Sequence, residues 1–151
     1  MTVAESLWNV TCLFLDTAPI IYYIEENRRY IATVASVFEL IFEGSIIGAT
    51  SPITLAECLI YPYRFEQTQL QQDYFNLIVR TNNITFVPIV DSSIALQAAQ
   101  IRARYNLQLP DAFQIAVALA AGCEAFLTND VTFKRIAKLR VLVLDELDLA
   151  E

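Results

Sequence analysis

The sequence predicts an α/β fold with a parallel central sheet, and three observations support this fold class. Short apolar runs alternate along the chain with segments of helical periodicity. The runs are continuous, which is typical of strands buried on both faces of a sheet. The length of 151 residues suits one domain with a substantial core. The predicted strands are Leu13–Leu15, Ile46–Thr50, Ile84–Ile89, Ala125–Leu127 and Val141–Leu144.

Helical segments are predicted between these strands. They cover Ala18–Glu43, Pro52–Thr81, Asp91–Gly122 and Val131–Ala137. Most are long enough for two helices, and strands that alternate with helices favour a parallel sheet. Tyr61-Pro62 predicts a break in the second segment, because the residue before a proline disfavours the helical conformation. Ser51 is a predicted helix N-cap and Gly122 a predicted helix stop.

The composition excludes several function classes. The chain has no histidine, which excludes triads with a histidine base and most zinc enzymes. Cys12, Cys58 and Cys123 are odd in number and widely spaced, so we expect neither a disulfide framework nor a thiolate zinc site. A reducing cytoplasm fits this cysteine usage. No apolar stretch reaches the roughly 20 residues of a membrane span, so no membrane association is expected.

The charge distribution is uneven. The net charge of −7 is typical of a plain acidic protein and does not by itself indicate nucleic-acid binding. Four of the ten Lys and Arg residues nevertheless fall within residues 134–140, and two further pairs are Arg28/Arg29 and Arg102/Arg104. A local basic rim could attract phosphates despite the overall sign.

Two acids follow predicted strands. Asp16 comes after Leu13–Leu15, and Asp130 comes shortly after Ala125–Leu127. Ligands of open α/β sheets bind beyond the carboxyl ends of the strands, which is where these two acids fall. A turn or cap role is an equally good interpretation for either acid alone.

Two further acids are predicted on core-facing helix positions. Glu57 falls within an apolar stripe made by Ile53, Ala56 and Ile60, so its carboxylate needs a partner, either an arginine or a metal ion. Asp111 lies in the first turn of a helix that is apolar nearly all round, where capping would also explain an acid.

The four acids together point to a metal site. If Asp16, Glu57, Asp111 and Asp130 converge, their charges repel one another unless a cation neutralises them. Oxygen ligands without histidine or cysteine select hard ions, here Mg²⁺ or Mn²⁺. Such ions serve phosphoryl chemistry by polarising the phosphate and activating water.

Three segments resemble the motifs of PIN-domain ribonucleases. They are LFLDT at 13–17, TLAE at 54–57, and LPDAFQIAVALAAGCEAFLTNDVTF at 109–133. The resemblance spans roughly residues 13–144, and its last segment is the most specific. It implies a three-layer fold with a parallel sheet of about five strands in the order 3-2-1-4-5 and helices on both faces. We expect an N-terminal extension at residues 1–12 and a single PIN-like domain at residues 13–151.

The resemblance also implies an activity, a site and partners. It implies a metal-dependent endoribonuclease in which Asp16, Glu57, Asp111 and Asp130 hold Mg²⁺ or Mn²⁺, with no organic cofactor. One of these acids would accept a proton from the attacking water. Thr128 would steady Asp130 or a water on the metal. The implied setting is the VapC-like toxin of a toxin–antitoxin pair, a homodimer with an RNA substrate and a small antitoxin as partners.

Three other interpretations remain open. A PIN-like domain could bind RNA or protein without cutting it. A haloacid-dehalogenase-like phosphatase also opens with a strand and an aspartate, but it needs a second aspartate where this chain has Ala18. A purely structural acidic α/β domain would show no dependence on metal. As a surface for partners we consider Tyr22, Tyr23, Tyr61, Tyr63 and Phe65, although we expect core packing for most of them.

Overall fold

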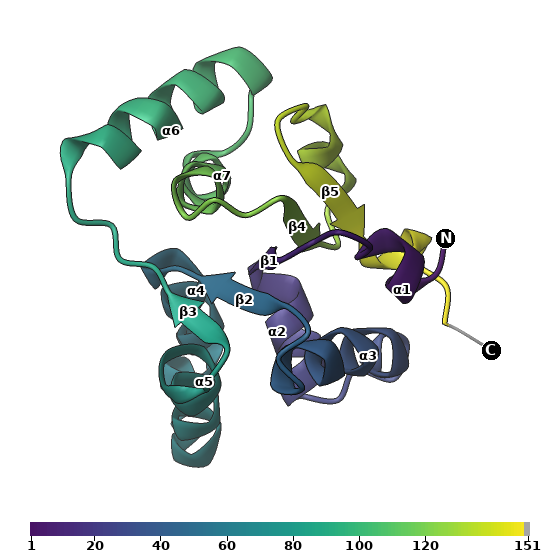
Figure 1. Ribbon diagram of the computed structural model, residues 1–151. Helices are drawn as coiled ribbons and strands as arrows, with labels where there is room; N and C mark the ends of the chain where they lie inside the picture. The colour runs from purple at the N-terminus through teal and green to yellow at the C-terminus, as the bar shows by residue number, and fades with distance from the viewer. Residues whose placement is uncertain (150–151) are drawn as a thin grey trace.

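The computed structural model describes residues 1–149 and contains a sheet of five parallel strands. The strands are β1 (Cys12–Leu15), β2 (Ile47–Thr50), β3 (Ile84–Phe86), β4 (Ala125–Thr128) and β5 (Arg140–Val143). Their order is β3-β2-β1-β4-β5, and every neighbouring pair is parallel (Figure 1). The predicted strands and their order are therefore confirmed. β2 begins one residue later than predicted. β3 ends three residues earlier than predicted, since the chain leaves the sheet just before Pro88, which has no N–H to donate.

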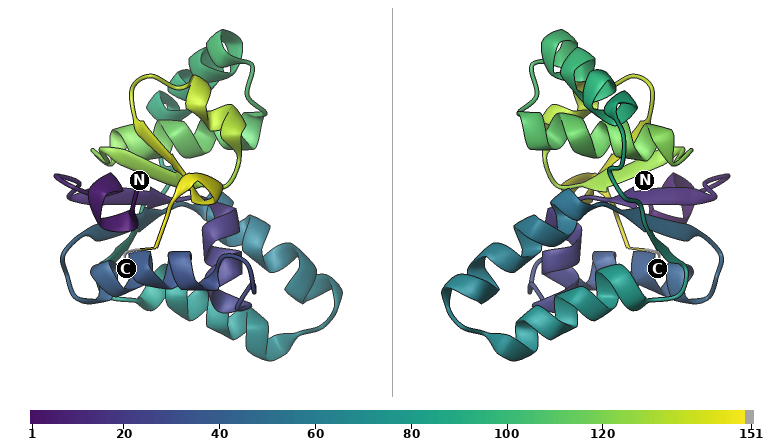
Figure 2. Two further views of the ribbon diagram at one scale, coloured as in Figure 1. Left: turned by 90° about the vertical axis from the view of Figure 1, so that its right-hand side faces the viewer. Right: turned by 90° about the vertical axis from the view of Figure 1, so that its left-hand side faces the viewer.

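Helices cover both faces of the sheet, as Figure 2 shows from two sides. They are α1 (Val3–Ser6), α2 (Thr17–Ile24), α3 (Ile31–Phe42), α4 (Pro52–Arg64), α5 (Thr68–Arg80), α6 (Ser92–Tyr105) and α7 (Leu109–Ala120), with short 3-10 helices η1 (Val131–Arg135) and η2 (Leu144–Glu146). Leu13 and Leu15 of β1 face one hydrophobic core, whereas Phe14 between them faces the other. This alternation confirms the three-layer arrangement.

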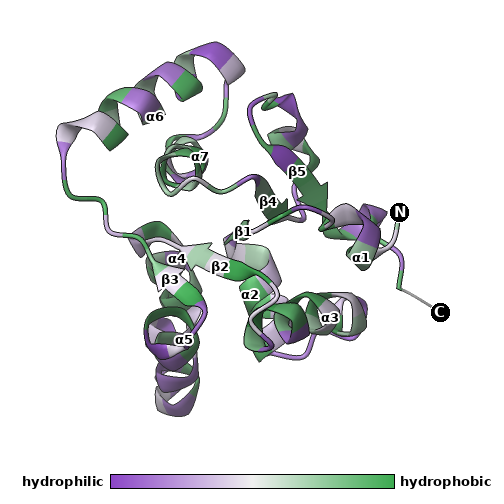
Figure 3. Ribbon diagram, viewed as in Figure 1, coloured by the Kyte–Doolittle hydropathy of each residue, from purple (hydrophilic) through white to green (hydrophobic). Residues whose placement is uncertain are grey.

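The helix α7 lies in the centre of its layer and is buried on nearly every side. In Figure 3 it is mostly hydrophobic, whereas α6 carries polar residues along much of its length. Gly122 follows α7 with φ +76°, and the N–H of Cys123 donates to the carbonyl of Ala118, which closes the helix. The predicted helix stop at Gly122 is confirmed.

The predicted break at Tyr61-Pro62 is wrong. Pro62 lies inside α4, which continues to Arg64 and ends at Phe65. The chain reverses at Glu66, whose φ is +54°, and the N–H of Gln67 donates to the carbonyl of Pro62 at 2.8 Å. Proline removes one helical hydrogen bond but does not always end a helix, and here it falls only two residues before the natural end. The predicted helix at Val131–Ala137 is a 3-10 helix.

The segment before β1 packs against the end of the chain. Thr2 caps α1 in a capping box with Glu5, and it pairs with Asp148 in a parallel bridge. Val3, Leu7 and Val10 are buried in the core. The division into an extension at residues 1–12 and a domain at residues 13–151 stays a prediction.

The expectation that no disulfide forms is wrong in this structure. Cys12 opens β1, and Cys123 lies two residues before β4; the two form a disulfide with Cα atoms 4.5 Å apart. Because β1 and β4 are parallel neighbours, the residues where the two strands begin lie side by side, and Cys12 meets Cys123 although 111 positions separate them in the chain. Cys58 is buried and free. No helix within residues 1–149 has the length and apolar character needed to cross a bilayer.

Candidate active site

Asp16 lies where β1 passes into α2, at the carboxyl edge of the sheet. Its backbone N–H donates to the carbonyl of Leu127, and its Oδ2 accepts a hydrogen bond of 2.8 Å from the hydroxyl of Thr128. Its side chain is 8% exposed and makes no capping bond to α2. Burial raises the pKa of Asp16 from the usual 3.8 to about 6, and the charges of Asp111 and Glu57 raise it further. The cap interpretation therefore does not account for Asp16.

Glu57 lies on α4 and is half-buried. The predicted apolar stripe around it is wrong, because the buried residues of α4 are Thr54, Cys58 and Pro62, whereas Ile60 is 50% exposed. Glu57 borders this buried face rather than an apolar one. Its Oε1 accepts a 2.7 Å hydrogen bond from the hydroxyl of Thr17, the first residue of α2. The first turn of α2 thus holds Glu57 beside Asp16.

Asp111 lies in the first turn of α7 and is half-buried. Gln108 is the residue at the N-cap position, and α7 has no side-chain cap bond. Burial raises the pKa of Asp111 to about 6, with further contributions from the charges of Glu57 and Asp130. Asp111 is therefore an acid near the helix N-terminus whose charge interacts with those of Glu57, Asp130 and Asp16.

Asp130 is exposed and caps η1. Its Oδ1 accepts hydrogen bonds from the N–H of Thr132 at 2.9 Å and from the hydroxyl of the same residue at 2.8 Å. The N–H of Asp130 donates in turn to the hydroxyl oxygen of Thr128 at 3.1 Å. A single buried threonine hydroxyl thus bonds both to the Asp16 carboxylate and to the backbone of Asp130. The cap interpretation for Asp130 describes its contacts, in contrast to Asp16.

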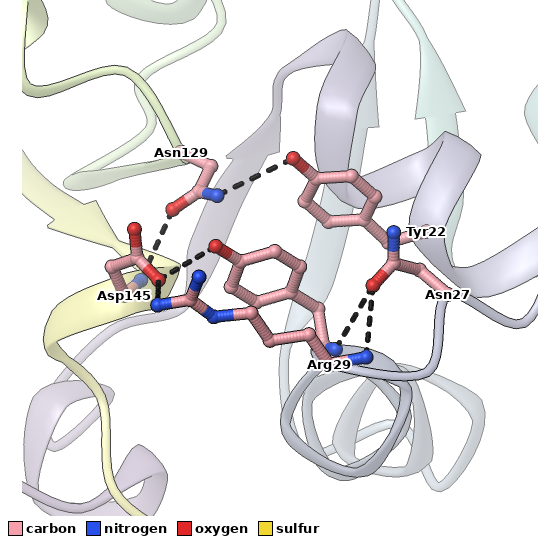
Figure 4. A network of polar contacts seen from close by, with 6 residues as sticks. Tyr22, Asn27, Arg29, Asn129 and Asp145 are labelled. Carbon is pink, nitrogen blue, oxygen red and sulfur yellow. Dashed lines mark hydrogen bonds and ion pairs between the residues drawn. The ribbon is translucent and has the colours of Figure 1, made fainter.

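Asn129, between Thr128 and Asp130, anchors this turn rather than facing the acids. Its amide donates to the hydroxyl of Tyr22 at 3.3 Å and accepts from the N–H of Asp145 at 3.0 Å (Figure 4). The same figure shows Arg29 reaching Asp145, at 3.1 Å. The network ties the end of β4 to α2 and η2, and so fixes the position of Thr128 and Asp130.

The four acids come together without a cationic partner. Within residues 1–149 the ion pairs are Met1–Asp148, Arg29–Asp145 and Lys134–Glu146, and none includes a site acid. Burial is the main cause of the raised pKa values of Asp16 and Asp111, and the negative charges of the neighbouring acids raise both further. Clustered carboxylates that stay unpaired in a folded protein are the kind of site that a cation stabilises.

The four acids, called the basin below, nevertheless do not form a closed coordination shell among the described residues. Among the residues described here, no three acidic, histidine or cysteine side chains gather closely enough to enclose an ion. Mg²⁺ commonly keeps several waters and binds through one or two carboxylates together with substrate phosphates. The donor set, made only of carboxylate and hydroxyl oxygens, fits an ion held in that way.

A buried polar network under the basin was missed by the sequence analysis. Gln114 is fully buried; its amide donates to the hydroxyl of Thr54 at 2.7 Å and its carbonyl oxygen accepts from Ser51. Thr54 also donates to the carbonyl of Leu15 at 3.5 Å. The network joins α7, α4 and β1 directly below Asp111, Glu57 and Asp16. The available signal was one glutamine within an otherwise apolar helix.

Comparisons with known proteins agree with this architecture. The family model of the PIN domain matches residues 13–139. No curated protein matches the chain. The fold is shared with VapBC2 from Rickettsia felis, solved bound to a DNA fragment from its promoter, at a TM-score of 0.69 and 17% identity over 88% of this chain and 98% of that one.

Two further structures share the fold. VapBC-1 from nontypeable Haemophilus influenzae aligns with a TM-score of 0.65 and 23% identity, over 90% of this chain and 100% of that one. VapC20 from Mycobacterium tuberculosis, a toxin that cleaves the sarcin-ricin loop, aligns with a TM-score of 0.62 and 15% identity, over 76% and 86%. The family match, the strand order and the acids at the carboxyl edge of the sheet agree, and the chain belongs to the PIN-domain family, with a VapC-like fold.

Proposed function

We propose that this chain is a metal-dependent endoribonuclease that hydrolyses RNA phosphodiester bonds. The observation that supports the proposal is that Asp16, Glu57, Asp111 and Asp130 lie near one another at one edge of a PIN fold and form no ion pair within residues 1–149. A bound Mg²⁺ or Mn²⁺ would supply the Lewis acid that polarises the scissile phosphate and activates water. PIN-domain nucleases generally use such ions.

The residues of the basin have distinct tasks in this proposal. Thr128 orients the carboxylate of Asp16, and Thr17 orients that of Glu57, so both present fixed oxygens. Asp111, whose pKa is raised to about 6, is suited to accept a proton near neutral pH. Asp130, which is exposed, contributes the fourth carboxylate of the basin.

The direct test is cleavage of a labelled RNA by the purified chain with Mg²⁺ or Mn²⁺, and by Asp16→Asn. Asp73→Asn on α5 is the matched control, because its side chain accepts only a hydrogen bond from Gln69 and an asparagine can still accept it. We expect cleavage by the wild type and the control, and a loss of at least about a hundredfold in Asp16→Asn. Equal cleavage by Asp16→Asn and the wild type would refute the assignment.

Metal binding has a readout that does not depend on activity. Millimolar Mg²⁺ or Mn²⁺ should raise the melting temperature of the wild type, because an ion that binds only the folded chain stabilises it. The rise should be smaller in Asp16→Asn. An unchanged melting temperature in the wild type would count against metal binding by the acids.

The second candidate is a PIN-like domain that binds RNA or protein without cutting. The open arrangement of the acids favours it, since no three of the described acids enclose an ion. The cleavage assay separates the two candidates. RNA binding without any metal-dependent cleavage would select this alternative.

We further propose that the chain is a toxin of a toxin–antitoxin pair, with a small antitoxin and a second copy of itself as partners. The shared fold with structures of VapBC complexes supports this. Tyr61, Tyr63 and Phe65 are 61%, 62% and 62% exposed, so the expected core packing is wrong for them, whereas Tyr22 and Tyr23 are half-buried. Exposed aromatics of this kind are enriched at protein interfaces.

Each partner has its own test. Sedimentation as a strict monomer at micromolar concentration would remove the homodimer. Co-expression with the product of the adjacent reading frame should relieve growth arrest caused by the chain alone. We propose a cytoplasmic location, where the RNA substrate is found. A Cys12–Cys123 disulfide is unusual in that compartment, and its state is tested below.

A further inference from the structure

The structure brings together two basic groups that are far apart in the sequence. Arg102 and Arg104 lie at the end of α6, and Arg135 and Lys138 lie at and after the end of η1. A guanidinium nitrogen of Arg135 donates to the backbone carbonyls of Tyr105 and Asn106, at 3.3 and 3.5 Å. These contacts bind the end of η1 to the end of α6.

The four side chains form a basic track, which we define as Arg102, Arg104, Arg135 and Lys138. Arg104 and Lys138 line one shallow pocket with Tyr105, and Arg102 donates to the side chain of Asn106 at 2.8 Å. All four are exposed, and none forms an ion pair with a described acid. They are four of only ten Lys and Arg residues in a chain of net charge −7, so this concentration of positive charge is local.

The other basic residues near η1 are used differently. Lys134 forms an ion pair with Glu146, and Arg140 donates to the carbonyls of Ser6 and Trp8 at 3.0 and 2.9 Å. Lys138 makes no such contact among the described residues. Arg135 also donates to two carbonyls, but unlike Arg140 it lines a pocket that contains two of the site acids.

The basic track leads into the acidic basin. A pocket of 270 Å³ lies between the α6–α7 connection and η1, and its lining includes Asp111, Asp130, Thr132 and Arg135. Arg135 thus shares one small polar pocket with two of the four site acids, although it does not pair with either. A pocket lined by two carboxylates and a guanidinium suits a phosphate that contacts both the guanidinium and a cation held by the carboxylates.

We propose that this pocket and the basic track bind the RNA backbone next to the scissile bond, with Arg135 contacting the phosphate nearest the basin. Arginine binds phosphate through two parallel N–H bonds, and its hold on two carbonyls orients the guanidinium in advance. Arg104 and Lys138 contact the following phosphates outside the pocket. The placement of the scissile bond rests on the proposed nuclease function.

A larger pocket between α4 and α5 does not have this character. It measures 390 Å³ and is lined by Leu59, Tyr63, Phe75 and Arg80 with polar uncharged residues. None of the four site acids lines it. A site for an RNA phosphate beside the acids is therefore assigned to the smaller pocket.

The test measures binding of a short labelled single-stranded RNA in EDTA, by fluorescence anisotropy over a range of KCl concentrations. Divalent metal is absent, so this readout is independent of cleavage. Arg104→Ala/Lys138→Ala removes two charges without removing a backbone contact, and Arg64→Ala/Arg80→Ala removes two exposed charges on α4 and α5 as the matched control. Arg135→Lys keeps the charge but loses the forked geometry.

We expect Arg104→Ala/Lys138→Ala to weaken RNA binding about tenfold and to lower the slope of log K against log salt by roughly 1.4, about 0.7 for each phosphate contact with a single strand. The control double variant should bind RNA like the wild type. In cleavage assays with Mn²⁺, Arg135→Lys should raise KM several-fold and lower kcat, whereas Arg104→Ala/Lys138→Ala should change KM alone. Melting temperatures confirm that each variant is folded.

The outcomes separate this inference from the proposed function. RNA binding in EDTA that depends on the track, without cleavage by the wild type, would support the basic track and refute the nuclease. Cleavage by the wild type with no effect of the track variants on binding, salt slope or KM would overturn the track. Competition by polyglutamate as strong as that by unlabelled RNA would assign the track to acidic protein segments instead, and would also overturn the inference.

Discussion

Replacement of Asp16 by asparagine should stabilise the metal-free protein at neutral pH. Asp16 is 8% exposed, and burial raises its pKa from 3.8 to about 6, so the folded chain holds its charged form at a cost. A difference of about 2 in pKa corresponds to ~3 kcal/mol, which is an upper value for one coupled group. Asparagine carries no charge, and its carbonyl oxygen can still accept the hydrogen bond from Thr128.

The sign of the pH dependence follows from the raised pKa. Below pH 3.8 the Asp16 carboxyl is neutral in both folded and unfolded chains and costs nothing. Between pH 3.8 and about 6 the unfolded chain releases the proton while the folded chain keeps it, so the free energy of unfolding falls. Above about pH 6 the carboxyl is charged in both states, and the free energy of unfolding stays lowered by the full cost of the buried charge. Asp111 acts in the same direction, but less strongly because it is half-buried and screened by solvent.

The assay is thermal unfolding in EDTA at several pH values from 4 to 8. For a chain of this size ~1 kcal/mol shifts the melting temperature by about 2–4 °C, so Asp16→Asn should melt up to ~10 °C above the wild type at pH 7.5. At pH 4 the two should nearly coincide, and Asp73→Asn should follow the wild type throughout. Parallel curves for wild type and Asp16→Asn, or a less stable variant at pH 7.5, would refute the electrostatic reasoning.

Three further predictions follow from the scaffold. Gln114→Leu should destabilise the chain by about 2–4 kcal/mol in urea unfolding, because it leaves the buried hydroxyls of Ser51 and Thr54 without their glutamine partner; stability equal to that of wild type would contradict the role of this network. Gly122→Ala should lower the free energy of unfolding by about 1–2 kcal/mol in the same measurement, because alanine is strained at a φ of +76°. An added Cβ would meet nothing within 4 Å, so this strain is the whole expected effect, and an unchanged stability would contradict it. The denatured chain, purified without reductant, should show one titratable thiol from Cys58, whereas three would contradict the Cys12–Cys123 disulfide.

The pattern of apolar residues along the chain was sufficient to predict most of the strands and helices of this fold. Continuous apolar runs identified all five strands, because a strand buried on both faces carries apolar side chains on both. The nearly all-round apolar character of Ala112–Ala121 predicted a buried helix, and most of its residues up to Ala118 are fully buried. The resemblance to the PIN family added the strand order, which periodicity alone does not contain.

Two predictions about α4 made from the sequence pattern were wrong, because they depend on which neighbouring elements the helix packs against. Pro62 did not end α4, and the stripe of Ile53, Ala56 and Ile60 turned outward while Thr54 and Cys58 turned inward. The surfaces that a helix meets decide which of its faces is buried; α4 meets α2, α5 and α7, and its buried residues are Thr54, Cys58 and Pro62. The two faces of α4 differ only moderately in hydrophobicity, so the sequence did not determine which face is buried.

The sequence by itself determined the strands, most of the helices and which acids stand at the ends of strands and helices, because these follow from spacing along the chain. Only the tertiary structure decided which distant side chains contact one another. These pairs are Thr17 with Glu57, Thr128 with Asp16, Gln114 with Thr54, and Cys12 with Cys123. These pairs are 40 to 112 residues apart. Their contacts arise from strand order and register, which bring distant segments together whatever their spacing in the chain.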